Sequence, residues 1–83
     1  MGKQNNVDPW EELANAIVIK AAADWRRANK RLRRNPYNGA AHREIDEIEK
    51  FFMSGWYTVL TAIPGERLIK MLKEEADNET KRI

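Results

Sequence analysis

The chain has 83 residues, no cysteine and one histidine, and its 15 Lys and Arg side chains nearly balance 13 Asp and Glu, for a net charge of +2. This length predicts one small domain, and the composition excludes disulfides and metal sites built from thiolates or several imidazoles. The longest apolar run, around AIVI, is far shorter than the about 20 residues of a membrane span, and MGKQNNVDP has no apolar signal segment. We therefore expect an intracellular protein without a membrane contact.

A long first helix is predicted over residues 9–34. Asp8 can cap it, Pro9 suits the first helical position, and Glu11 completes the pattern of a capping box. Apolar side chains recur at steps of three and four residues on one stripe: Trp10, Leu13, Ala14, Ile17, Ala21, Trp25, Ala28 and Leu32. Asn35-Pro36 ends the helix, because a residue before proline is disfavoured in the α conformation.

The short connector NPYNG predicts an antiparallel helical hairpin. Asn38 is the expected cap of the second helix, whose apolar positions are Ala41, Ile45, Ile48, Phe51 and Phe52. Residues 39–63 form either one long kinked helix or two helices that separate at Ser54-Gly55. In the second case Ser54 caps a short helix that buries Trp56, Val59, Leu60 and Ile63.

A last amphipathic helix is expected after the break at 61–65, with Leu68, Ile69 and Leu72 turned inward. The predicted fold class is all-α: a compact bundle of three to four helices that begins with a long helix and an antiparallel helical hairpin. Its single domain covers residues 8–76, between a flexible N-terminus at 1–7 and a frayed polar tail at 77–83. The large aromatic side chains Trp10, Trp25, Phe51, Phe52 and Trp56 are expected in its core, and Tyr37 and Tyr57 at its surface.

A basic face is predicted near the end of the first helix. Its seven cations fall within roughly 160° of the helix circumference, opposite the apolar stripe: Lys20, Arg26, Arg27, Lys30, Arg31, Arg33 and Arg34. Tyr37 lies beside them and could stack on a base. The basic face could contact nucleic-acid phosphates or an acidic protein surface. Alternatively, it is solvated and partly neutralised by Glu44, Asp46 and Glu47 of the second helix.

The first helix is apolar nearly all round over residues 16–23, which indicates that it is covered from two sides. Either the last helix folds back over this segment, or Ala16, Ile19 and Ala23 form the seam of a homodimer. Small side chains at Ala14, Ala21 and Ala28 would allow helices to approach closely.

No catalytic constellation is recognisable. His42 and Asp46 lie four residues apart without a third ligand, and a capping role accounts for Ser54. We therefore expect a protein that is not an enzyme and that uses no cofactor and no metal.

Four stretches carry a resemblance to a known group of proteins: LANAIVIKAAADWRRA, RLRRNPYN, EIEKFFMSGWYTVLT and PGERLIKML, in that order. Over about residues 10–75 the chain resembles a family of small uncharacterised helical proteins encoded by prophages and integrative elements of Gram-positive bacteria. It departs at Ile63-Pro64, where the family pattern has an acidic residue before Gly65. The resemblance implies an accessory protein of a mobile element, located in the cytoplasm of its bacterial host, without implying a defined activity.

Two binding functions remain open at this point. One is a nucleic-acid accessory protein that uses the basic face. The other is a protein–protein inhibitor or adaptor that occupies a host factor, by analogy with anti-CRISPR and other anti-defence proteins. A mimic of DNA is disfavoured, since it would need a strongly acidic face.

Overall fold

A computed structural model describes residues 8–81, with the side chains of residues 8–79. It contains four helices: α1 (Pro9–Arg34), α2 (Gly39–Phe52), α3 (Gly55–Leu60) and α4 (Gly65–Lys81), and no strand occurs within residues 8–81. The predicted all-α bundle is therefore confirmed, and residues 39–63 form two helices. The expectations for residues 1–7 and 82–83 fall outside the described residues.

The ends of α1 lie where the sequence predicts them. The Asp8 carboxylate accepts a hydrogen bond from the backbone N–H of Trp10 at 3.0 Å, and the N–H of Asn35 donates to the carbonyl of Arg31 at 3.0 Å. Pro9 occupies the first turn, where its missing N–H has no cost. At the other end, the positive side chains of the last turn favour the negative end of the helix dipole.

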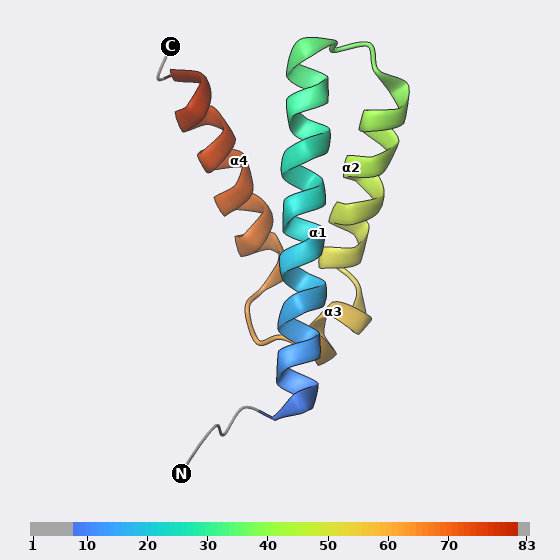
Figure 1. Cartoon of the computed structure of the whole chain (residues 1–83), viewed down its shortest axis with the longest axis vertical. Coiled ribbons are helices and arrows are strands. Elements are labelled where there is room, and N and C mark those ends of the chain that lie inside the picture. The colour runs from blue at the N-terminus through green and yellow to red at the C-terminus, as the bar shows by residue number, and fades with distance from the viewer. Residues whose placement is uncertain (1–7, 82–83) are drawn as a thin grey trace.

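The α1–α2 pair is an antiparallel hairpin, and the two helices lie side by side in Figure 1. The Asn38 side chain accepts a hydrogen bond from the N–H of Ala41 at 3.1 Å and so caps α2. Ala28 of α1 and Ala41 of α2 are both fully buried. Small side chains at these two positions allow the helices to pack closely.

The core draws on all four helices. Its buried members are Ala22, Trp25, Phe52, Tyr57 and Leu72. Trp25 is only 3% exposed, and its Nε1 donates a hydrogen bond to Glu49 Oε2 at 2.9 Å. The inward position predicted for Trp25 is therefore confirmed, and its one polar atom is satisfied inside the bundle.

The expectation for α3 is wrong in its register. Tyr57 is fully buried and packs edge-on against Phe51 and Phe52, with ring centroids 5.9 and 5.7 Å away, whereas Trp56 is 63% exposed and Val59 74% exposed. Ser54 causes the change, because its hydroxyl donates to the Phe51 carbonyl and accepts from the Tyr57 N–H. The chain turns at this cap, so the apolar period of α2 does not continue into α3.

Helix α4 begins against the end of α2. A Cβ at Gly65 would overlap the carbonyl oxygen of Phe52, so only glycine permits this approach. The carbonyl of Pro64 accepts the N–H groups of Arg67 and Leu68, each at 3.1 Å. From there α4 diverges from α1 (Figure 1) and continues to Lys81, so residues 77–81 are helical where a frayed tail was expected.

Candidate functional site

The structure pairs five of the seven cations of the basic face with the chain's own carboxylates, three of them on other helices. Arg26 Nε lies 2.6 Å from Glu75 Oε1, and Arg33 Nη2 lies 3.2 Å from Glu79 Oε1, both on α4. Arg31 pairs with Glu44 of α2. Neutralisation by Glu44 agrees with the sequence expectation, whereas the two α4 partners were not foreseen. These arginines thus link α1 to its neighbours.

The rest of the basic face points outward. Lys20 and Arg27 share one carboxylate, Asp24, with a Lys20 distance of 3.2 Å. Lys30 and Arg34 are exposed and form no ion pair within residues 8–79. Tyr37 is 91% exposed, as expected. The cationic surface that remains for a ligand is consequently much smaller than the sequence suggests.

The proposed dimer seam lies on this same outward side of α1. Ile19 is 66% exposed, Ala16 is exposed and Ala23 is half-buried. The last helix does fold back over one side of segment 16–23, where Leu72 of α4 packs in the same cluster as Ala22, but it leaves Ala16 and Ile19 exposed. Of the seam, only Ile19 offers a large exposed apolar side chain.

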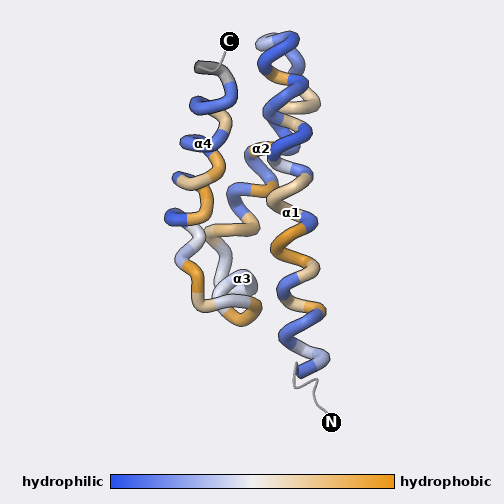
Figure 2. Tube along the Cα trace, turned by 60° about the vertical axis from the view of Figure 1, so that its left-hand side comes forward, coloured by the Kyte–Doolittle hydropathy of each residue, from blue (hydrophilic) through white to orange (hydrophobic). Residues whose placement is uncertain are grey.

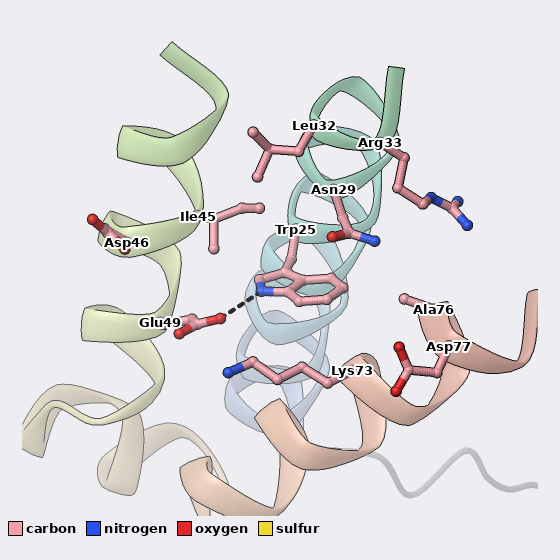
Figure 3. Close-up of a pocket in the computed structure, with 10 residues that line it drawn as sticks. All are labelled: Trp25, Asn29, Leu32, Arg33, Ile45, Asp46, Glu49, Lys73, Ala76 and Asp77. Atoms are coloured by element: carbon pink, nitrogen blue, oxygen red, sulfur yellow. Dashed lines mark hydrogen bonds between the residues drawn. The ribbon is translucent and has the colours of Figure 1, made fainter. Parts of the chain in front are cut away.

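A wedge pocket of about 550 Å³ opens between α1, α2 and α4, and Figure 3 shows the ten residues that line it. Its walls mix carboxylates with cations: Asp46, Glu49 and Asp77 with Arg33 and Lys73. Trp25 lies among them but is almost completely covered. The wedge pocket therefore offers neither an open apolar surface nor one sign of charge, and we assign it no ligand.

An apolar groove, also of about 550 Å³, lies at the other end of the molecule, between α1 and α3. Seven of its eight lining residues are apolar: α1 contributes Trp10, Leu13, Ala14 and Ile17, and α3 contributes Trp56, Val59 and Leu60. The remaining one is Glu11. In Figure 2 orange stretches alternate with blue ones along the N-terminal half of α1, whereas its C-terminal turns are mainly blue.

The groove exists because the helices of the hairpin differ in length. Helix α1 has 26 residues and α2 has 14, so roughly the first 18 Å of α1 extends past the end of α2. Among the described helices, α3, with six residues, is the one that packs beside this extension. A helix so short cannot cover it, and large apolar side chains stay in contact with solvent.

The exposed walls of the groove correct the predicted core. Trp10 is 72% exposed and Leu13 51%, although the helical stripe placed both inside. Trp56 and Val59 are exposed because the turn at Ser54 places Tyr57, and not these two side chains, in the core. Sequence periodicity assigned each of these side chains to an apolar helix face. It could not show whether that face packs against another part of the chain or against a separate molecule.

Glu11 is the charged member of the described residues that line the groove. The walls of the groove belong to residues 8–19 and 53–65, and these two segments contain no Lys or Arg. The first cation along α1 is Lys20, which is bound to Asp24. The molecule thus has an acidic apolar end and a basic end about Arg26–Arg34.

Other chemistry has little support in the described part of the chain. No group of three His, Asp or Glu side chains within residues 8–79 gathers closely enough to hold a metal ion. None of the helices in residues 8–81 combines the length and apolar character that a membrane crossing requires. Comparisons with protein-family models, with curated proteins and with solved structures each give no match.

Proposed function

We propose that the chain is a non-enzymatic protein-binding module, an accessory protein of a mobile genetic element that docks a partner protein of its bacterial host in the apolar groove. The observation that carries this proposal is the exposure of Trp10, Leu13, Trp56 and Val59 around one hollow. Contiguous apolar surface of this kind marks interaction sites, and tryptophan is among the side chains that contribute most to binding energy. This supports the inhibitor or adaptor over the nucleic-acid accessory protein.

The basic face supports a second candidate, the binding of a nucleic-acid backbone. Lys30 and Arg34 are exposed and form no ion pair within residues 8–79, although Lys30 lines a small pocket between α1 and α4 that also contains Glu75 and Glu79. Against it, Arg26, Arg31 and Arg33 are bound to carboxylates of α2 and α4. Each such pair lowers the positive potential that would attract phosphate.

Site-specific photo-crosslinking in cells that produce the chain tests the first candidate. A photoreactive side chain at Val59 should form one discrete adduct, whereas the same group at Ile19 should not. Ile19 is the matched control, because it is also large, aliphatic and exposed but lies on the other side of α1. The substitution Trp56→Ser should abolish the Val59 adduct and change stability by no more than about 0.5 kcal/mol, since Trp56 is mostly in solvent. Indistinguishable adducts from the two positions would contradict the proposal.

A further inference from the structure

The groove limits the kind of partner that fits it. Resting on the proposed function, we infer that the segment it takes is an amphipathic α-helix that carries Lys or Arg beside its apolar face. Two independent features of the groove support this kind of partner. Both of its walls are helices, and its charge is negative.

The first feature is shape. Both walls of the groove are helices, and Trp10, Leu13 and Ile17 follow one another along about two turns of α1. Apolar grooves between two helices commonly receive the apolar face of a third one, with anchors at steps of three and four residues. An incoming helix would complete the cover that α3 is too short to give.

The second feature is charge. The polar side chain that lines the groove is Glu11, and residues 8–19 carry no cation that could neutralise it. Helix α3 and the segments on either side of it, residues 53–65, carry no charge at all. Lys or Arg on the flank of a docked helix would meet the Glu11 carboxylate, whereas Glu or Asp there would be repelled.

The chain itself is a poor source of the occupant. The segment that precedes α1 has the sequence MGKQNNV, in which only Met1 and Val7 are apolar. Helix α4 ends at the opposite end of the molecule (Figure 1). A second copy that paired groove to groove would bring a second Glu11 carboxylate into the interface with no Lys or Arg from residues 8–19 or 53–65 to neutralise the two, which opposes a symmetric dimer at this surface.

Selection from a display library of random peptides of about 20 residues, long enough for a helix of about 30 Å, tests this inference on the full chain. Selected peptides are synthesised and titrated against the wild-type chain and against Val59→Ser, with Ile19→Ser as the matched control. We expect peptides with an amphipathic helical pattern and an excess of Lys and Arg. Their affinity should fall at least tenfold in Val59→Ser and stay within twofold of wild type in Ile19→Ser.

The variant Glu11→Gln tests the contribution of charge, with Glu12→Gln on the Ile19 side of α1 as the matched control. We expect Glu11→Gln to weaken the basic peptides about two- to fivefold at low salt, as the loss of one surface charge contact predicts, and Glu12→Gln to have a smaller effect. Groove-directed peptides without excess positive charge, or unchanged affinity in Glu11→Gln, would overturn the inference and leave the proposed function intact. Failure to select any peptide that is sensitive to Val59→Ser would overturn both.

Discussion

Tyr57 is a buried side chain with an unsatisfied polar atom. Its hydroxyl oxygen is fully buried and has no hydrogen-bond partner among the residues that the structure describes. The ring, in contrast, packs against Phe51 and Phe52 in favourable edge-on geometry. The ring of Tyr57 therefore stabilises the fold, whereas its buried hydroxyl destabilises it.

The substitution Tyr57→Phe should raise the free energy of unfolding by about 1 kcal/mol, because an unpaired buried hydroxyl costs about 1–3 kcal/mol and its removal leaves only a small void. Urea denaturation followed by circular dichroism measures the change. A loss of more than about 1 kcal/mol would mean that the hydroxyl has a partner.

The same variant has a distinct pH dependence. Burial raises the pKa of Tyr57 above its ordinary value of 10.0. The unfolded chain then releases this proton at a lower pH than the folded one, so the wild-type fold loses stability as the pH rises above about 10. Tyr57→Phe should lose less stability than wild type over that range.

The close approach of Gly65 to Phe52 can be tested by substitution, with Gly55 as the matched control. The Cβ of Gly65→Ala would lie 2.7 Å from the carbonyl carbon of Phe52, closer than packed atoms approach, while nothing lies within 4 Å of a Cβ at Gly55. Gly65→Ala should therefore lower the free energy of unfolding by at least about 2 kcal/mol. Gly55→Ala should be neutral or raise it by up to about 1 kcal/mol. Equal effects in thermal unfolding would show that α4 does not start against α2.

Some residue positions follow from the sequence and others do not. Asp8, Asn38 and Ser54 were identified as caps, because a side-chain oxygen before an apolar run can accept a hydrogen bond from the next turn. The choice between Trp56 and Tyr57 as the buried aromatic was missed. It depends on the direction in which the chain leaves Ser54, and no pattern within six residues of helix encodes that direction.

At the scale of the helices, α4 is attached to α1 partly by charge. The pairs Arg26–Glu75 and Arg33–Glu79 connect the two helices where they diverge. The Arg31–Glu44 contact could be anticipated, because a short hairpin places the end of α1 beside the start of α2. The contacts with α4 could not be anticipated, because the sequence does not show on which side of α1 the last helix packs.

The variant Glu75→Gln/Glu79→Gln should lower the free energy of unfolding by about 0.5–1 kcal/mol at low salt, in line with two exposed ion pairs. High salt should remove most of this difference, because it screens the pairs in wild type. Glu74→Gln is the control, since Glu74 is exposed and forms no ion pair within residues 8–79. An equal loss of unfolding free energy in Glu74→Gln would mean that the change in net charge, and not the loss of the ion pairs, causes the effect.

For the molecule as a whole, the separation of its charges predicts how it meets nucleic acid. If only Lys30 and Arg34 contact phosphate, binding to duplex DNA should be weak, and log affinity should fall against log salt with a slope of about −2. Fluorescence anisotropy over a salt series measures this slope. A slope of about −5 or steeper, of which Lys30→Gln/Arg34→Gln removes about 2, would instead make the basic face the functional surface.

The unequal lengths of α1 and α2 have a consequence for the life of the protein in a cell. A chain that leaves Trp10, Trp56 and Val59 in water gains stability when those side chains are covered, so a bound partner shifts the unfolding equilibrium by mass action. Molecules in excess of the partner unfold more often and are removed sooner by proteases. The abundance of this protein should therefore follow the supply of its partner.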